Sequence, residues 1–574
     1  MAFTRMFSAG GSPLPNRRLL KSSKRALMDS APSLSTMASR SRWATTVPTP
    51  KSSRHPRERR KFLMRQNYGG TPLAQRVLSG AMTSAQSHST STLVLGAGYA
   101  GLTAAALLAN EGHEVTVLES HDTLGGCASF YRVGKCTYDV GATTVSGVVD
   151  SQPAGRVFRH LGIVPEFIKQ DPGMVIRMGE RDVLRHAGVD AWIDEAERHF
   201  PGGRQGAFWQ ELYRLEQRVW SLVQGLTHFP PANASDVLRL AKPSLLASAP
   251  LSLGLIRPMD VLMERYGVHG NSDFRRFINE QLLISTQNTS SAAPYLTGAM
   301  GLTYPSETYY PVGGMVRPAL MLMRHATSKG AQVKFRRRVT AITRQAGSWL
   351  VSCDNGETYR ADRVVSSIPI WNMASLTDER VRSHFERLSH RFDFGWGAIT
   401  LYIGIKGVPR LPSQYVQLHL NEPIPFVHSG SVFMTFSHPD DRQKAPEGMT
   451  TLTVSTHAMA EDWKGLSPEE YARRKSIVTE AIVNLIRRRM HELDGMEFEH
   501  IDAGTPQTWV SYTQRHDGFV GGIPHDVRRP LFMLPPNQTP FTGLYMIGDS
   551  AFPGQGMPAV MLGAWNTVAR IFDA

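Results

Sequence analysis

The chain has few cysteines, no long apolar run and no cluster of histidines. Its three cysteines in 574 residues cannot make a disulfide framework and suit a reducing compartment. No stretch reaches the roughly 18 consecutive apolar residues that a membrane-spanning helix needs. The 20 histidines are scattered without the spacing of metal ligands, so we predict no metal site. These absences argue against a disulfide-rich secreted module, a helical membrane protein and a zinc domain.

The body of the chain also lacks net charge. The formal net charge is +14, but residues 1–90 alone hold 16 Lys and Arg against two acidic residues. The remainder contains 47 basic and 47 acidic residues. Because this body has no net field to attract a polyanion, we expect no nucleic-acid partner.

The basic segment itself, residues 1–90, is rich in Ser, Thr, Arg and Ala. It lacks the apolar core of roughly 7–15 residues that a secretory signal contains. We interpret it as a removable organellar presequence, and its composition alone does not separate plastid from mitochondrion. The alternative is a disordered basic arm, in which residues 54–65 would contact anionic lipid.

A glycine-rich turn follows the first predicted strand, residues 93–95, and precedes a predicted helix that ends near residue 110. In this turn Gly96 permits a tight bend, Gly98 lets the backbone approach a pyrophosphate, and Gly101 allows close helix packing. Glu119 ends the second predicted strand, where a carboxylate accepts the ribose hydroxyls of an adenosine. The pattern predicts a dinucleotide site, and a purely structural glycine turn is the alternative.

Two further segments favour FAD over NAD. Gly125 and Gly126 follow Glu119 closely and bring the backbone near a pyrophosphate and flavin. More than 400 residues later, Asp549 follows a predicted strand, where its carboxylate would accept the ribityl hydroxyls of a flavin. The alternative for Asp549 is a helix N-cap. The sequence thus predicts one flavin site built from both ends of the chain.

The pattern of secondary structure predicts an α/β fold with a Rossmann-type FAD-binding domain and an α+β substrate domain. Residues 150–300 are mostly helical in pattern, and β-type alternation begins near Gly395. A helix within this β region has Ser467 as its N-cap and Glu470 as the partner in a capping box. The predicted segments are residues 1–90 for the presequence, 91–150, 301–394 and 505–574 for the FAD-binding domain, and 151–300 and 395–504 for the substrate domain with its membrane-contact helices.

Five motifs carry a resemblance to a known family: residues 93–109, 124–147, 309–315, 504–524 and 548–560. Together they resemble the carotenoid isomerase and phytoene-type carotenoid desaturase family of FAD-dependent, amine-oxidase-like flavoproteins, over residues 92–574. The resemblance implies FAD-binding roles, by position, for Gly96, Gly98, Gly101, Glu119, Gly125, Gly126 and Asp549, and it places Val339 beside the adenine. It also implies an apolar tunnel for a carotenoid or other long polyene, peripheral contact with a membrane surface, and a plastid (chloroplast) location.

The resemblance leaves the reaction open. Desaturation removes a hydride and a proton from the polyene, whereas cis–trans isomerisation has no net redox change, and we favour isomerisation. Glu307 and Asp517 are the best carboxylate candidates for proton transfer; the alternatives are an exposed loop charge and a turn residue. Only one nucleotide motif is present, so a desaturase would need an external acceptor such as a membrane quinone or oxygen.

Three other functions compete with this prediction. They are a retinol-saturase-like polyene reductase, a flavin amine oxidase, and a non-catalytic isoprenoid carrier. The apolar segment Leu245–Ile256 is too short to span a bilayer, and we weigh a membrane-dipping entrance against a buried connection.

Overall fold

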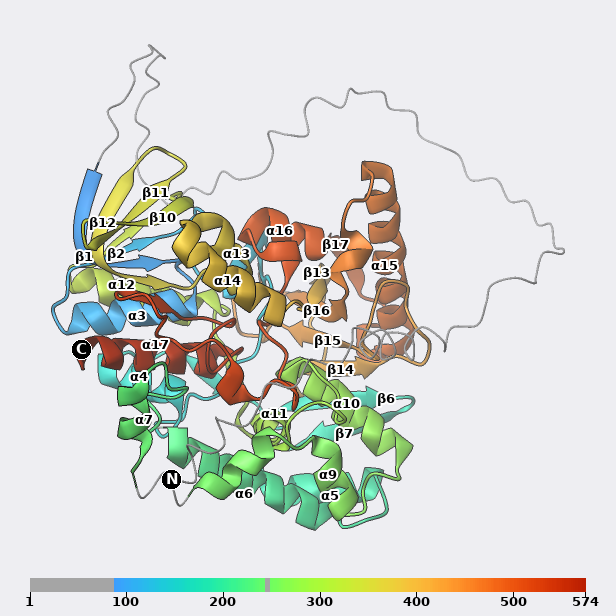
Figure 1. Cartoon of the computed structure of the whole chain (residues 1–574). Coiled ribbons are helices and arrows are strands. Elements are labelled where there is room, and N and C mark those ends of the chain that lie inside the picture. Colours follow the sequence, from blue (N-terminus) through green and yellow to red (C-terminus); the bar gives the residue numbers. More distant parts are fainter. Residues whose placement is uncertain (1–86, 224, 243–247, 574) are drawn as a thin grey trace, which may run out of the picture. The chain divides into compact units, whose positions relative to one another are not determined.

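The computed structural model describes residues 87–223, 225–242 and 248–573. Residues 1–86 of the predicted presequence therefore lie outside the described part. The first strand, β1 (Ser87–Leu95), begins earlier than the sequence pattern predicted, because Ser87 to Thr90 pair with the strand that contains Thr358 to Ala361. Two sheets of seven strands each, flanked by helices, organise the described residues (Figure 1).

The first sheet has the order β10-β11-β12-β1-β2-β9, with β18 pairing to β12. Its other strands are β2 (Val115–Leu118), β9 (Gln332–Lys334), β10 (Val339–Gln345), β11 (Ser348–Cys353), β12 (Thr358–Ser366) and β18 (Leu544–Met546). The central pairs β12–β1, β1–β2, β2–β9 and β12–β18 are parallel, whereas β10, β11 and β12 form an antiparallel meander. The parallel core confirms the predicted Rossmann-type architecture.

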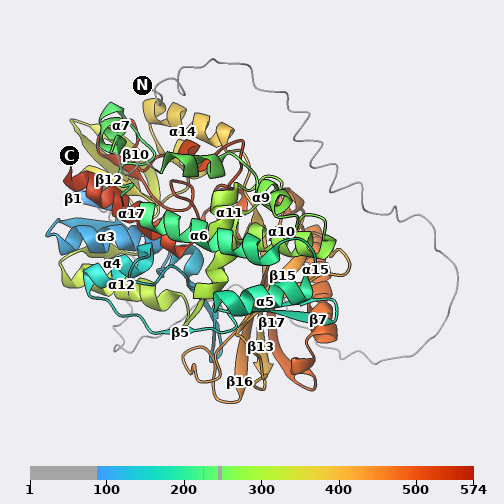
Figure 2. The same cartoon turned by 90° about the horizontal axis from the view of Figure 1, so that it is seen from below.

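Helices cover both faces of this sheet. On one face, α3 (Tyr99–Asn110), α4 (Pro153–Leu161), α12 (Val316–Ser328) and α17 (Met557–Phe572) share a core with Val94 and Val117. On the other face, α13 (Ile370–Leu376) and α14 (Glu379–Arg391) pack with Leu93 and Leu95. Residues 93–95 are wholly buried, as a central parallel strand requires. Figure 2 shows α3, α4, α12 and α17 close together.

The second sheet has the order β17-β13-β16-β15-β14-β6-β7. Its strands are β6 (Met174–Met178), β7 (Arg181–Arg185), β13 (Gly397–Lys406), β14 (Tyr415–His419), β15 (Ser431–Phe436), β16 (Met449–Ala458) and β17 (Glu497–Gly504). All neighbours are antiparallel except β14 and β6. Strands β6 and β7 come from a stretch with a mostly helical pattern, and they join the sheet only through long-range pairing.

Helix α15 (Pro468–Arg489) covers one face of the second sheet, where Val478 and Ile482 share a core with Ile403. The predicted N-cap is confirmed, since the Ser467 side chain accepts a hydrogen bond from the Glu470 backbone N–H at 3.2 Å. The other half of the predicted capping box is wrong. The Glu470 carboxylate instead binds Arg473 and Arg474, whose positive charges compete for it.

A helical layer packs on the far end of the second sheet. It comprises α5 (Val189–His199), α6 (Gln205–Val223), α9 (Met259–Arg265), α10 (Ser272–Thr286) and α11 (Tyr295–Thr303), with α7 (Ala234–Leu240) near α17. Its core is aromatic: Trp192 and Trp209 pack edge to face, with their ring centroids 4.9 Å apart. Two small ribbons, β3 (Phe130–Val133) with β4 (Cys136–Asp139) and β5 (Phe167–Lys169) with β8 (Tyr309–Pro311), complete the strands, and α16 (Pro506–Thr513) precedes the last segment.

Candidate functional site

The predicted glycine turn lies between β1 and α3, at the carboxyl end of the parallel strands. Gly96 has φ +100°, and a Cβ at Gly101 would lie 1.9 Å from the Gly96 carbonyl oxygen. The bend and the close helix approach therefore both require glycine. Helix α3 has no side-chain cap and no acidic residue in its first turn, so its N–H groups remain available to an anion.

The second glycine pair completes one wall with this turn. The Gly125 N–H donates to the Ala97 carbonyl at 2.8 Å, and Gly98 bridges to Gly125 in parallel. A Cβ at Gly126 would lie 3.4 Å from the Gly98 Cα. Two motifs separated in the sequence thus form a continuous surface of bare backbone, which suits a pyrophosphate.

Glu119 lies beside the same turn. Its Oε2 accepts the Ala97 N–H at 2.7 Å, and its Oε1 accepts the His121 N–H at 2.8 Å. The Glu119 carbonyl accepts the Arg337 N–H at 2.8 Å, two residues before Val339. The structure therefore brings Val339, at the start of β10, close to the predicted ribose acceptor.

Asp549 lies three residues after the end of β18, and its side chain is 18% exposed. Its Oδ2 accepts a hydrogen bond from Arg515 at 2.8 Å. It is not the N-cap of α17, because that helix begins eight residues later with Gly556 as its N-cap. Like α3, helix α17 has no side-chain cap and no acid in its first turn. The N-cap alternative for Asp549 is therefore wrong.

These features fit a flavin dinucleotide. Glycine backbone lines the surface that a pyrophosphate would approach, and the Glu119 carboxylate hydrogen-bonds to the Ala97 N–H of the same turn. The uncapped N-termini of α3 and α17 supply N–H donors and partial positive charge to an anionic group. Glu119 and Asp549 come from strands β2 and β18, which belong to the same sheet but lie far apart in sequence.

A polar and aromatic cluster lies beyond Asp549, and sequence reasoning missed it. The Trp396 indole N–H donates to the Gln287 carbonyl at 3.0 Å, and the Gln287 amide donates to the Val520 carbonyl at 3.0 Å. The rings of Trp396 and His457 meet edge to face at 5.5 Å. Burial lowers the pKa of His457 to about 4, so this imidazole is neutral at physiological pH.

Gln555 connects this cluster to the last glycine motif. Its side-chain amide donates to the Ser285 carbonyl at 2.5 Å. A Cβ at Gly521 would lie 2.6 Å from the Gln555 Oε1 and 1.7 Å from the Gln287 Nε2. Helix α10, strand β13 and the loops at 520 and 555 thus converge. Gln287, Trp396 and His457 lie outside the sequence motifs, and each comes from a different element, so no local pattern marks them.

The two predicted proton-transfer carboxylates lie elsewhere, in ion pairs. Glu307 accepts hydrogen bonds from the Lys169 ammonium at 3.1 Å and the Tyr309 hydroxyl at 2.7 Å. Asp517 accepts from the Lys464 ammonium at 2.9 Å. In the part of the chain that the structure describes, neither carboxylate hydrogen-bonds to a predicted cofactor residue. Their proposed role in catalysis stays a prediction.

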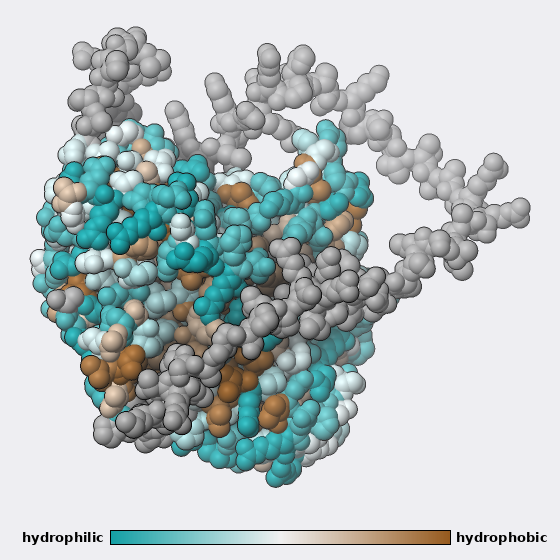
Figure 3. Space-filling view, viewed as in Figure 1, coloured by the Kyte–Doolittle hydropathy of each residue, from teal (hydrophilic) through white to brown (hydrophobic). Residues whose placement is uncertain are grey.

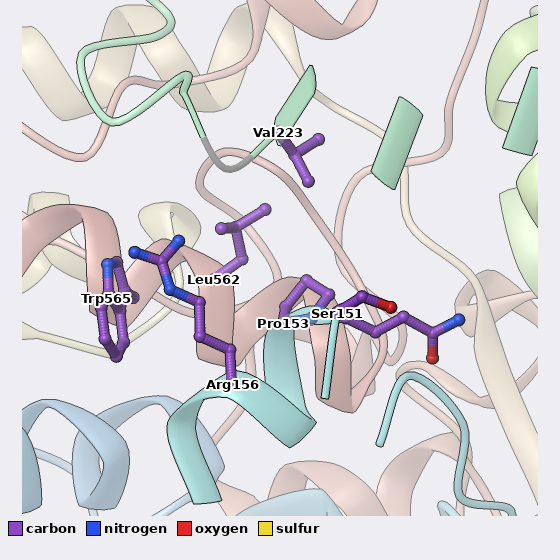
Figure 4. Close-up of a pocket in the computed structure, with 7 residues that line it drawn as sticks. Ser151, Pro153, Arg156, Val223, Leu562 and Trp565 are labelled. Carbon is purple, nitrogen blue, oxygen red and sulfur yellow. The ribbon is translucent and has the colours of Figure 1, made fainter. Parts of the chain in front are cut away.

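A shallow hollow lies between α4, α6 and α17 (Figure 4). The Arg156 guanidinium is stacked on the Trp565 ring at 4.2 Å, and Leu562 and Val223 face the hollow. It contains none of the predicted cofactor residues, so it is separate from the candidate flavin site.

Residues 87–223, 225–242 and 248–573 contain neither a metal-binding cluster nor a membrane-spanning helix. No group of three or more His, Cys, Asp or Glu side chains there is placed to hold a metal ion. None of the helices of residues 87–223, 225–242 and 248–573 combines the length and the apolar character needed to cross a bilayer. The three cysteines, Cys127, Cys136 and Cys353, are free thiols.

Comparisons with known proteins agree with this geometry. The family model described as flavin containing amine oxidoreductase matches residues 99–572. The chloroplastic prolycopene isomerase of Daucus carota is 26% identical over 498 residues, covering 82% of this chain and 77% of that protein. The carotenoid 3,4-desaturase of Haloarcula japonica is 23% identical over 503 residues, covering 84% and 97%.

Among solved structures, an oxidoreductase from Methanosarcina mazei superposes with a TM-score of 0.54 at 16% identity. The superposition covers 84% of this chain and all of that one. At this identity the likeness concerns the fold alone. Together with the family model, it confirms the predicted amine-oxidase-like α/β fold.

Proposed function

Because the chain belongs to the flavin containing amine oxidoreductase family, we propose that it is an FAD-dependent enzyme of carotenoid biosynthesis that acts on a carotenoid or related long polyene. The proposal of FAD rests on one observation. The Glu119 carboxylate hydrogen-bonds to the glycine turn, beside the bare backbone of Gly98 and Gly126. FAD, unlike a mononucleotide, needs an acceptor for its adenosine ribose at one end and a second acceptor for its ribityl chain. Glu119 and Asp549 supply the two.

The polyene substrate is supported by the chloroplastic prolycopene isomerase and the archaeal carotenoid desaturase among the relatives. We favour cis–trans isomerisation over desaturation. The cluster that contains Trp396 and His457 is compatible with both reactions, because the Trp396 ring is apolar and the His457 imidazole is neutral. Such a surface would orient a hydrocarbon chain and exclude water without stabilising a full charge.

The protein and the cofactor would have separate roles in the reaction. The flavin would supply the redox chemistry, and the chain would bind, orient and shield the reacting double bond. No second nucleotide motif is present in the sequence. A desaturase built this way would therefore pass electrons to a membrane quinone or to oxygen, whereas an isomerase would need neither in each turnover.

We further propose a plastid location and peripheral contact with a membrane. Val237 and Leu238 are exposed on α7, and Leu238 is 77% exposed. Leu253 and Ile256 are exposed at the end of the predicted apolar segment, whose residues 245–247 lie outside the described part. Figure 3 shows apolar surface gathered on the lower part of the face in view. Exposed apolar side chains of this kind suit a lipid surface.

The decisive experiment is stoichiometric. Purified protein with reduced FAD would be incubated anaerobically with cis and trans carotenoids, and the mass of the product and the electrons delivered to an added quinone would be counted. Isomerisation predicts a product of unchanged mass, with no quinone reduced beyond the electrons that the reduced flavin itself held at the start. Two electrons per product would establish desaturation instead, and a product heavier by two hydrogens would establish reduction. Absence of flavin from the purified protein would favour the carrier alternative.

A further inference from the structure

Arg515 is a buried cation between the two halves of the candidate flavin site. It lies in the loop after α16, and its side chain is only 10% exposed. One terminal nitrogen donates to the Asp549 carboxylate at 2.8 Å, and Nε donates to the Phe519 carbonyl. The guanidinium also interacts electrostatically with Cys127, the residue that follows the Gly125–Gly126 pair. Arg515 thus interacts with both segments that the sequence assigned to the cofactor.

Asp549 and Cys127 also stabilise the charged form of Arg515. Burial by itself would lower the pKa of this guanidinium, but the charge of Asp549 and the hydrogen bonds of Asp549 and Cys127 raise it above its usual range. A guanidinium has five N–H donors in a rigid planar fork. The hydrogen bonds to Asp549 and Phe519 use two of these five donors.

The surroundings explain why a buried cation is useful there. Glu119 and Asp549 place two carboxylates along a path that a diphosphate, itself an anion, would follow. The uncapped N-termini of α3 and α17 offset part of this negative charge. Arg515 adds a full positive charge and fixes which oxygen of Asp549 remains free to accept a hydroxyl.

We propose that Arg515 is a positioning residue for the flavin, which orients the Asp549 carboxylate and sets the electrostatic potential at the middle of the cofactor. The proposal rests on FAD as the cofactor and does not depend on which polyene reaction follows. It makes Arg515 and Asp549 a coupled pair with opposite effects on the flavin. Loss of the cation destabilises the more negatively charged reduced flavin, and loss of the carboxylate charge stabilises it.

The test compares R515M, R515K and D549N with the wild-type protein. Cys127 is half-buried whereas Cys136 and Cys353 are buried, so alkylation by N-ethylmaleimide reports mainly on Cys127. The FAD concentration that half-protects Cys127 measures cofactor affinity without any catalytic assay. R515M should raise this concentration roughly 10- to 100-fold, which corresponds to the loss of charge-assisted hydrogen bonds. R515K should fall between, because lysine keeps the charge without the fork.

The midpoint potential of the bound flavin is the second readout, and a merely structural role would not give it opposite signs. R515M should lower the potential, and D549N should raise it. R473M, which breaks an ion pair on the exposed face of α15, is the control and should change neither readout.

Equal FAD affinity in R515M and the wild type, or potential shifts of the same sign in R515M and D549N, would overturn the proposal. If R515M does not fold, R515K provides the test. An FAD affinity of R515K equal to that of the wild type would also overturn the proposal. A wild-type protein that does not bind FAD would instead remove the proposed cofactor, so the two failures are distinguishable.

Discussion

Gly98 and Gly101 stand three residues apart in the same turn, yet a methyl group added at each would meet different surroundings. At Gly98 the new Cβ would lie 3.9 Å from the nearest protein atom, the Gly126 Cα, which is ordinary contact. At Gly101 it would lie 1.9 Å from the Gly96 carbonyl oxygen. The protein therefore has room for a methyl group at Gly98 but not at Gly101.

We therefore expect G98A to fold like the wild type but to bind FAD at least about tenfold more weakly, because its methyl group occupies the path of the pyrophosphate. G101A should instead lower the free energy of unfolding by roughly 1–3 kcal/mol through overpacking. Flavin retention after gel filtration and urea unfolding measure the two effects. Full FAD affinity in a folded G98A would rule out the proposed pyrophosphate wall.

Three histidines in desolvated positions give the protein a defined sensitivity to acid. Burial lowers the pKa of His457 and His525 to about 4, and burial together with Arg276 lowers that of His419 to about 3. The ordinary value in an unfolded chain is about 6.5. As the pH falls below about 6.5, the unfolded state takes up protons that the folded state does not.

The free energy of unfolding should thus be independent of these histidines above about pH 6.5 and fall toward pH 4. The expected slope is up to about 1.4 kcal/mol per pH unit for each histidine. Urea unfolding at a series of pH values measures it. In H419F, which removes one titrating group, the slope should be shallower; a slope equal to that of the wild type would contradict the assignment.

At the scale of elements, helix α17 is secured by a buried ion pair. Arg570, near its C-terminal end, donates to the Asp236 carboxylate of α7 at 2.8 Å, and both side chains are at most 5% exposed. Asp236 also accepts the Ala232 N–H at 2.8 Å. Because α17 begins at the candidate flavin site, this pair fixes the far end of a helix whose near end faces the cofactor.

R570M should reduce the free energy of unfolding by about 3–5 kcal/mol, because it leaves a buried carboxylate without its cation. R159M is a matched control, since Arg159 pairs with Asp150 on the surface, where the two side chains are 60% and 71% exposed. Its expected cost is about 0–1 kcal/mol. Equal losses in the two variants would show that burial of the Arg570 pair does not matter.

At the scale of the whole molecule, the basic N-terminal segment is separable in our prediction from the catalytic body. A protein that lacks residues 1–86 retains all of β1 and should keep its flavin content and its unfolding transition. Deletion through residue 91 removes the pairing of Ser87 to Thr90 with β12 and should lower stability. The shorter deletion should abolish import into isolated plastids. Import of the protein that lacks residues 1–86 would contradict the interpretation of this segment as a presequence.

Much of the candidate cofactor site could be predicted from the sequence alone. Gly96, Gly101, Glu119 and Asp549 lie in a tight turn or just after a strand, so their spacing already encodes their local geometry. The Ser467 N-cap was predictable for the same reason, since its partner is the N–H of Glu470, three residues away. Local stereochemistry determines such features, and a single segment contains all the information.

The tertiary structure decided the rest. Strands β6 and β7 became part of the second sheet only because β14 offers them an edge. Arg515 meets Cys127, and Trp396 meets His457, across separations that no periodicity records. Glu307 and Asp517 were candidates because of their motifs, but the fold gave each a lysine partner. Contacts between distant segments depend on which surfaces the packed core brings together, and that is a property of the whole chain.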